Sequence, residues 1–338
     1  MRLVLDAMGT DARPVSDVAG AVMAARELGE TIILVGPQAR LEQELKKHDT
    51  VGLKIEIVDA RDEIEMTDKP SVVLKQKPES SMHIGLSLVR DHKADAFVTM
   101  GNTGAAHAIA TLSILRRLPG VKRPALCIIY AVSRKPTVFL DMGANADSKA
   151  DWLEQYAIMG MAYAQTALNN PNPRIATLSN GEEEGKGNEL VREVQHRLQA
   201  LPINYIGHIE PKELLEGKTD VVVFDGFLGN VFLKTFEGTL SYFAGMLREE
   251  LMSGWMSKIG GLLIRSAVGR IRKRVDPDEY GGALLLGVRG VVVIGHGSGS
   301  PLAVKSAIGQ AYNAVKGKTI ETIQTRLAQL TPQSLAEE

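Results

Sequence analysis

Short aliphatic runs alternate with longer, helix-like segments along almost the whole chain. Runs of β-branched and aliphatic residues are typical of buried strands, and apolar residues at three- and four-residue spacing are typical of helices. Strands that alternate with helices imply a largely parallel sheet covered on both faces. We therefore predict a doubly wound α/β fold, with strands at residues 3–5, 31–35, 55–58, 96–100, 125–130, 137–140, 175–178, 221–224 and 291–294, and helices at 15–28, 40–47, 82–92, 103–115, 152–167, 190–201, 231–251 and 302–315.

Five of these strands end in loops that combine glycine with Asn, Asp, Ser or Thr: residues 6–11, 101–104, 141–145, 225–230 and 295–300. Ligands bind at the carboxyl ends of strands in open α/β sheets, and we expect parallel strands to bring all five loops to one rim. Each loop alone also fits a structural role, as a helix cap or a strand-end turn. The candidate substrate-binding residues are Asp6, Gly9, Gly101, Thr103, Gly104, Asp141, Asp225 and Asn230.

A sixth loop, residues 179–189, reads Ser-Asn-Gly-Glu-Glu-Glu-Gly-Lys-Gly-Asn-Glu between a predicted strand and a predicted helix. Glycines let backbone N–H groups approach an anion, and Lys186 adds a positive charge. The spacing does not match a Walker A loop, in which Ser or Thr would stand at Gly187. We predict a phosphate site without nucleotide binding, and a solvated turn is the alternative. The residues concerned are Asn180, Gly185, Lys186, Gly187 and Asn188.

Composition and missing motifs narrow the function classes. The chain has 39 basic and 40 acidic residues among 338, so its net charge of −1 gives no reason to expect a nucleic-acid partner. The single cysteine, Cys127, lies in an apolar run, where we expect a buried thiol. Without His-Glu-x-x-His, paired Cys, Gly-x-Ser-x-Gly or a full dinucleotide loop, we expect no metal and no cofactor. With no signal-type core and no apolar run of about 18 residues, we expect a cytoplasmic protein.

Seven motifs, taken in order, resemble those of the PlsX-type phosphate acyltransferases. They lie at residues 6–11, 101–105, 141–145, 180–189, 225–231, 280–290 and 296–298, and so cover nearly the whole chain. Thr10 and Leu284 depart from the family pattern, which has glycine and proline at these positions. The resemblance implies a bacterial enzyme, with one acyltransferase domain over residues 1–338. Such an enzyme moves a fatty acyl group from acyl carrier protein to inorganic phosphate, giving acyl phosphate for phospholipid synthesis.

The implied reaction requires neither a metal nor an acyl-enzyme, because phosphate is already an anionic nucleophile and a thioester carries a good leaving group. The enzyme must bring the anion to the carbonyl carbon and stabilise the developing oxyanion. We expect Lys186 to hold phosphate and His296 to protonate the departing thiolate. The strand-end aspartates are expected to orient the oxyanion donors. Those donors are expected among Asn102, Thr103 and Asn145.

A basic, amphipathic helical insertion is predicted at about residues 245–275, as a protruding helical hairpin. Residues 251–275 contain no acidic side chain, and apolar residues recur there at helical spacing. Such a segment suits an anionic membrane surface or the acidic surface of acyl carrier protein, and a dimer interface or core packing is the alternative. Gly254, Gly260 and Gly261 indicate a helix–turn–helix tip. The candidate contact residues are Trp255, Lys258, Leu262, Arg265, Arg270, Arg272 and Lys273.

Two such tips in a homodimer would form a larger surface, from which a membrane glycerol-3-phosphate acyltransferase could receive acyl phosphate.

Three other functions fit parts of the pattern. A phosphotransacetylase-like enzyme would use coenzyme A and short acyl groups. A non-enzymatic regulator would bind an anion without turnover, and a dehydrogenase would change nicotinamide absorbance.

Overall fold

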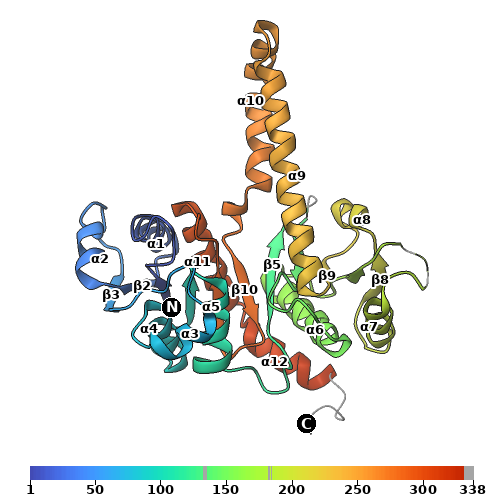
Figure 1. Ribbon diagram of the computed structural model, residues 1–338, viewed down its shortest axis with the longest axis horizontal. Coiled ribbons are helices and arrows are strands. Elements are labelled where there is room, and N and C mark those ends of the chain that lie inside the picture. Colours follow the sequence, from blue (N-terminus) through green and yellow to red (C-terminus); the bar gives the residue numbers. More distant parts are fainter. Residues whose placement is uncertain (132–134, 182, 184, 331–338) are drawn as a thin grey trace.

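The computed structural model describes residues 1–131, 135–181, 183 and 185–330, which form one 11-stranded sheet with helices on both faces (Figure 1). The strand order is β3-β2-β1-β4-β11-β10-β5-β6-β9-β7-β8. The strands are β1 (Arg2–Asp6), β2 (Thr31–Gly36), β3 (Ile55–Asp59), β4 (Ala96–Thr99), β5 (Ala125–Tyr130), β6 (Thr137–Leu140), β7 (Ile175–Leu178), β8 (Tyr205–Ile209), β9 (Val221–Val223), β10 (Ala283–Leu286) and β11 (Val291–Ile294).

The predicted doubly wound α/β fold is confirmed, and every predicted strand and helix is present with small shifts at its ends. Strands β8 and β10 and the helices α3, α8 and α12 are additional. The helices are α1 (Val15–Leu28), α2 (Gln38–Leu45), α3 (Pro70–Gln76), α4 (Ser81–Arg90), α5 (Thr103–Ala108), the π-helix η1 (Ile109–Ile114), α6 (Ala150–Ala167), α7 (Glu189–Gln199), α8 (Pro211–Glu216), α9 (Gly226–Met252), α10 (Trp255–Val275), the 3₁₀-helix η2 (Pro277–Glu279), α11 (Pro301–Lys316) and α12 (Thr319–Leu330).

The two halves of the sheet run in opposite directions. Strands β1 to β4 and β11 are mutually parallel, and so are β6, β7, β8 and β9. Between them, β10 is antiparallel to both β11 and β5, and β5 is antiparallel to β6. The prediction that all the polar loops share one rim is therefore wrong. Loops 6–11, 101–104 and 295–300 form a first rim at one end of the strands. Loops 141–145, 179–189 and 225–230 form a second rim at the opposite end of the strands.

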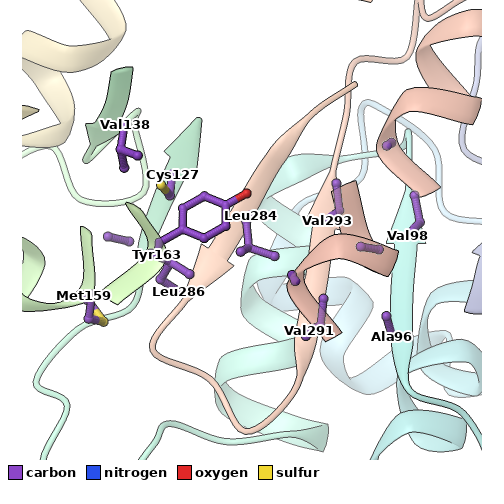
Figure 2. Packing of buried hydrophobic residues seen from close by; sticks show 14 of the residues in the cluster. Ala96, Val98, Cys127, Val138, Met159, Tyr163, Leu284, Leu286, Val291 and Val293 are labelled. Atoms are coloured by element: carbon purple, nitrogen blue, oxygen red, sulfur yellow. The ribbon is translucent and has the colours of Figure 1, made fainter. Parts of the chain in front are cut away.

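Side chains alternate between the two faces of the sheet, as the period of two in a strand requires. In β11, Val291 and Val293 enter the core beneath α1, α6 and α11, whereas Val292 and Ile294 enter the core beneath α4, α5 and α9. Figure 2 shows the first of these cores, in which Cys127 packs among aliphatic side chains. The predicted buried thiol is confirmed, and burial raises the pKa of Cys127 well above its ordinary value.

Helices α9 and α10 form a hairpin that projects away from the sheet (Figure 1). The hairpin starts earlier than predicted, because α9 is continuous from Gly226 to Met252. The turn falls at Gly254, whereas Gly260 and Gly261 lie inside α10. Chain continuity and the pairing of Ala283 with Ile294 place the base of α10 beside the first rim. Within the described residues, none of the helices has the length and apolar character that crossing a bilayer requires.

Candidate active site

A groove of about 250 Å³ runs between β5 and the first turns of α9, and it connects the two rims across one face of the sheet. Its floor is mostly apolar and comes from β5, while polar side chains come from loops on both rims and from α9. This combination suits a ligand with an apolar chain and a polar or charged head. The groove is lined by Thr103, Leu126, Ile128, Ile129, Tyr130, Met142, Gly143, Asn230, Leu233, Lys234, Glu237, Tyr280, Gly281, Gly282, Ala283, Ile294, Gly295 and His296.

At the first rim, Thr103 reaches the groove but its neighbour Asn102 does not line it. The side-chain oxygen of Asn102, Oδ1, accepts a hydrogen bond from Ala105 N at 2.9 Å and caps α5. Its amide nitrogen donates to the backbone oxygens of Glu65, Met66 and Asp68 at 2.9–3.2 Å. These internal acceptors bond its amide group, so Asn102 fixes the loop, and its role as an oxyanion donor stays a prediction.

His296 is exposed in the groove, on a turn that is bonded to three other parts of the first rim. Gly295 N donates to Thr99 O at 2.8 Å, and Asp11 N donates to Gly297 O at 2.7 Å. The Ser300 hydroxyl donates to Asp278 Oδ2 at 2.5 Å, which connects this turn to η2 at the base of the hairpin. The imidazole of His296 is thus presented from a well-tethered backbone.

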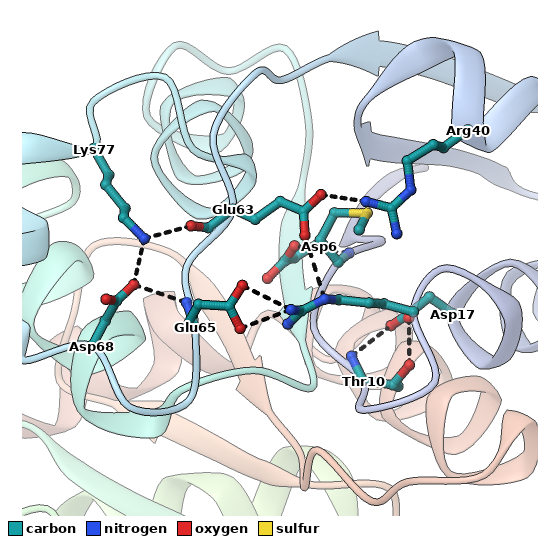
Figure 3. A network of polar contacts seen from close by, with 10 residues as sticks. Asp6, Thr10, Asp17, Arg40, Glu63, Glu65, Asp68 and Lys77 are labelled. Carbon is teal, nitrogen blue, oxygen red and sulfur yellow. Dashed lines mark hydrogen bonds and ion pairs between the residues drawn. The ribbon is translucent and has the colours of Figure 1, made fainter.

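Two buried carboxylates lie behind the first rim (Figure 3). Asp6 is 1% exposed and accepts a bond from the Thr99 hydroxyl at 2.7 Å, and Asp17 accepts one from the Thr10 hydroxyl at 2.5 Å. Burial raises the pKa of Asp6, and it raises the pKa of Asp17 to about 7. The Asp6 carboxylate is therefore enclosed and holds the loop, and its contact with substrate stays a prediction.

The predicted substrate-binding glycines of the first rim also have packing roles. A Cβ at Gly9 would lie 2.7 Å from Met100 N, and one at Gly101 would lie 2.6 Å from the Met82 side chain. Both residues are buried, so they allow two loops to approach closely rather than contact a ligand. Gly104 is exposed but does not line the groove.

At the second rim, Asp141 organises the loop that follows β6. Its buried carboxylate accepts bonds from Leu126 N at 2.9 Å, Ala144 N at 3.0 Å and Asn145 N at 2.8 Å. Burial raises the pKa of Asp141, and these bonds to backbone N–H groups oppose the rise. Asp141 therefore holds the loop and does not line the groove, and its contact with substrate stays a prediction.

Asn145, predicted as an oxyanion donor, points into the same loop. Its amide nitrogen donates to Pro124 O at 2.8 Å, to the Asp141 carboxylate at 3.0 Å and to the Tyr156 hydroxyl at 3.0 Å. Asn145 therefore fixes this loop, and its role as an oxyanion donor stays a prediction. Asp225 likewise caps α9 by accepting a bond from Leu228 N at 2.8 Å.

Of the predicted residues on the second rim, Asn230 does line the groove. It lies opposite Gly143, where an added Cβ would be 3.6 Å from Asn230 Cβ. Gly143 has a φ of 117°, a conformation that L side chains rarely adopt. The exposed amide of Asn230 is therefore brought to this end of the groove by a close approach between the loop and α9.

The 179–189 loop is held by its own side chains. Asn180 accepts a bond from Gly187 N at 3.0 Å, and Asn188 caps α7 through Val191 N at 2.9 Å. Lys186 is half exposed, with its ammonium group 3.8 Å from the Glu183 carboxylate, and Gly185 and Gly187 have φ values of 88° and 90°. The described residues of this loop do not line the groove, and residues 182 and 184 lie outside the description. Phosphate binding at Lys186 stays a prediction.

The sequence analysis did not identify the groove residues on α9, or the aromatic side chains Tyr130 and Tyr280 that line the groove. Lys234 and Glu237 follow Asn230 at helical spacing, so one face of α9 carries all three. The Tyr130 ring lies 4.7 Å from the Tyr280 ring and 5.7 Å from the Phe236 ring, and burial raises the pKa of Tyr130. The helical period could have grouped the α9 residues, but it could not show which face of the helix meets β5.

Comparisons with known proteins identify the family. Residues 1–322 match the model of a family described as "Fatty acid synthesis protein". A phosphate acyltransferase of Trichlorobacter lovleyi is 43% identical over 329 residues, which cover 97% of this chain and 95% of that relative. The chain belongs to the phosphate acyltransferase family. A second family member, from Acidobacterium capsulatum, is 47% identical and aligns over 90% of this chain and 91% of its own length.

Solved structures with the same fold include a phosphotransacetylase from Streptococcus pyogenes, with a TM-score of 0.60, 18% identity, and coverage of 95% of this chain and 94% of that one. A branched-chain phosphotransacylase from Enterococcus faecalis has a TM-score of 0.55, 16% identity, and coverage of 93% and 99%. At these identities the likeness establishes the α/β fold alone. As a member of the phosphate acyltransferase family, this chain is an acyltransferase that transfers acyl groups to phosphate.

Proposed function

We propose that this acyltransferase takes a fatty acyl group from acyl carrier protein and transfers it to inorganic phosphate in one displacement. An oxygen of phosphate attacks the thioester carbonyl carbon, a carbon–oxygen bond forms, and the carbon–sulfur bond breaks. The thiolate of the carrier protein leaves and takes up a proton, and the other product is an acyl phosphate. The observation that carries the proposal is the groove, because its apolar floor and polar ends suit a fatty acyl thioester.

Two polar side chains at the first-rim end of the groove receive roles in this proposal, whereas Asn230 lines the opposite end. Thr103 donates a hydrogen bond to the carbonyl oxygen as negative charge develops on it. His296 protonates the departing thiolate, a step that suits an exposed imidazole on a tethered turn. Asn102 and Asn145 position the loops at the two ends of the groove, since their own amide groups bond internally.

The sequence predicts that Lys186 holds phosphate together with the amides of Gly185 and Gly187, and in this proposal the 179–189 loop attracts phosphate. The positive φ values of both glycines turn the backbone sharply around the lysine. The loop lies on the same rim as the Gly143–Asn230 end of the groove. This arrangement supports a role in drawing phosphate toward the groove from solvent.

The hairpin is proposed to contact an anionic membrane and acyl carrier protein, and to deliver acyl phosphate to a membrane glycerol-3-phosphate acyltransferase. Trp255 is 74% exposed and Leu262 is 69% exposed, which leaves large apolar side chains near the tip uncovered. Lys258, Arg265 and Arg270 add positive charge on α10, and the side chains of Arg272 and Lys273 lie outside the described residues. A homodimer that pairs two hairpins would enlarge this surface.

The reaction is tested with purified protein, a long-chain acyl–acyl carrier protein, and inorganic phosphate. We expect thiol release that depends on phosphate, and acyl phosphate among the products by mass spectrometry. Coenzyme A thioesters are assayed in parallel, because their preferential use would support the phosphotransacetylase-like alternative. Thiol release from neither donor would overturn the proposed function.

The hairpin surface is tested by sedimentation with anionic lipid vesicles. Replacing Trp255 and Leu262 together with Ser should lower the bound fraction, because both apolar side chains lose their favourable transfer into the lipid interface. A matched control is Val51→Ser, since Val51 is 91% exposed but distant from the hairpin in the sequence and fold. Equal binding by all the proteins would contradict membrane contact through this surface.

A further inference from the structure

We propose that Lys234 on α9 is the residue that binds phosphate inside the groove, and that Glu237 holds its ammonium group until phosphate replaces the carboxylate. This inference rests on the proposed function, because it assigns the nucleophile of that reaction to a position. It differs from the prediction made from the sequence, which gave phosphate to Lys186.

The first observation is the position of Lys234 in the groove. Among the described residues that line the groove, Lys234 is the only lysine or arginine. It lies one helical turn beyond Asn230 on the same face of α9, and the same groove contains Thr103 and His296. A phosphate bound to Lys234 would therefore share the groove with the groups proposed to act on the thioester.

The second observation is the state of the Lys234 ammonium group. Its nitrogen lies 3.3 Å from Glu237 Oε2, one turn further along α9. An ammonium group has three N–H donors, so the recorded carboxylate contact uses one of them. Because the Lys234 side chain is 55% exposed, the ion pair is weak, and a phosphate dianion can compete with Glu237 for the lysine.

The third observation is the surroundings of the pair. Leu233, Ile128 and Met142 line the same groove, and apolar walls reduce the screening of a nearby charge. Lys186 is about equally exposed, at 51% against 55% for Lys234, but it lies in a loop whose described residues do not line the groove. The difference between the two lysines is therefore one of position, because an anion at Lys234 is held beside the apolar walls that suit the acyl chain.

The chemistry assigned to this pair requires no further reactant. Phosphate displaces the Glu237 carboxylate from Lys234, and the ammonium group keeps its proton throughout. Attack on the carbonyl carbon then proceeds as in the proposed reaction, with the thiolate as leaving group. The ammonium group orients the nucleophile and balances its charge, and Glu237 recovers the lysine when acyl phosphate leaves.

The test measures the Michaelis constants of phosphate and of the acyl donor separately. Lys234→Gln should raise KM for phosphate roughly 10- to 100-fold, the loss expected for one charge-assisted hydrogen bond, while KM for the acyl donor stays near the wild-type value. Lys234→Arg should recover most of the phosphate affinity, which a purely structural loss would not allow. Glu237→Gln should lower KM for phosphate about two- to fivefold, because it removes the competing carboxylate.

The matched control is Lys305→Gln. Lys305 is also a lysine paired with a glutamate, Glu27, at 2.6 Å, but this pair joins α11 to α1 and does not line the groove. This variant should behave as the wild type does. A wild-type KM for phosphate in Lys234→Gln would overturn the inference, and an unchanged KM in Glu237→Gln would overturn the role of Glu237.

A binding measurement separates failure of this inference from failure of the proposed function. Inorganic phosphate should raise the melting temperature of the wild type and of Lys305→Gln, but not that of Lys234→Gln. This readout requires no turnover. If the wild type lacks phosphate-dependent thiol release yet shows this pattern of stabilisation, only the proposed reaction is wrong. If phosphate still stabilises Lys234→Gln but not Lys186→Gln, the loop is the phosphate site and the inference fails.

Discussion

The two rims of the sheet are built from loops of similar composition, and buried carboxylates hold both, with a different balance of donors. On the first rim, Asp6 and Asp17 each accept one side-chain hydroxyl, from Thr99 and Thr10, and one backbone N–H group. On the second rim, the single Asp141 carboxylate accepts three backbone N–H groups and the Asn145 side-chain amide. In both cases, most of the Asp, Asn and Gly residues that look catalytic in the sequence serve to fix a loop. The groups free to act on a ligand are the few that reach the groove.

The largest effect is expected on the second rim. Asp141→Ala should lower the free energy of unfolding by at least about 3 kcal/mol, because the backbone N–H groups of Leu126, Ala144 and Asn145 lose their acceptor. Urea denaturation measures this loss, and Asp141→Asn should cost less because one acceptor oxygen remains. A loss below about 1 kcal/mol for Asp141→Ala would show that water replaces the carboxylate, and that the second rim is not fixed as described.

On the first rim, stability should depend on pH through Asp17. Its carboxyl has a pKa of about 7 in the folded protein and an ordinary pKa of 3.8, so the folded state binds more protons between these values. The free energy of unfolding should therefore fall as pH rises through this window, by about 1.4 kcal/mol per unit, and then level off above it. Denaturation at pH 5.5 and pH 8 measures the change.

The control for this pH dependence is Asp17→Asn, which keeps an acceptor for the Thr10 hydroxyl but does not titrate. The free energy of unfolding of the wild type, relative to that of the variant, should fall as pH rises from 5.5 to 8, because only the wild type has a titrating group at this position. A difference that is constant over this range would mean that Asp17 titrates well below pH 5.5, and that burial affects it less than stated.

A smaller effect is expected where the first rim meets the hairpin. Ser300→Ala removes the hydroxyl that bonds to Asp278 and caps α11, at a cost of about 1 kcal/mol. Because the same turn carries His296, kcat should fall more than KM for either substrate changes. Ser300→Thr keeps the hydroxyl and should restore kcat. If Ser300→Ala lowers stability but leaves kcat unchanged, the turn does not depend on this bond for its catalytic geometry.

The smallest effect is the interaction between the two lysines. Their contributions to phosphate use should be independent, because Lys186 lies in an exposed loop and Lys234 lies in the groove. In a double-mutant cycle, the KM increases of Lys186→Gln and Lys234→Gln should multiply, with a coupling below about 0.5 kcal/mol. A larger coupling would mean that both ammonium groups contact one phosphate, and that the loop closes over the groove during turnover.

Periodicity in the sequence was enough to predict nine of the eleven strands of the described residues, the two covered faces and the helical hairpin. It missed β10, and it could not predict the two rims. Because β10 is antiparallel to both β11 and β5, strand β5 runs in the same direction as β11, and the antiparallel pairing of β5 with β6 then reverses the second half of the sheet. Which strand lies beside which is a long-range property, and a pattern within one segment does not contain it.

The candidate site was predictable only in part for a related reason. Thr103, Asn230 and His296 come from segments that follow strands, and the structure places all three on the lining of the groove, while their roles stay predictions. Asn102 and Asn145 also stand in loops that follow strands, but their side-chain amides donate hydrogen bonds to backbone carbonyl groups of the protein. This difference depends on atomic geometry. Nothing in the sequence of α9 separates Lys234 from any other exposed lysine, because only packing against β5 decides which face borders the groove.

Helix α9 has 27 residues, and so it is a rod about 40 Å long that carries Asn230 and Lys234 near one end and the turn of the hairpin at the other. Seen mechanically, it is a lever. A tilt of about 5° around its inner end moves the outer end by roughly 3 Å over such a length. In the same way, a force on the tip is transmitted to the wall of the groove, because α9 is continuous between the two. Docking at the tip should therefore change the width of the groove, because a single rigid helix forms part of both.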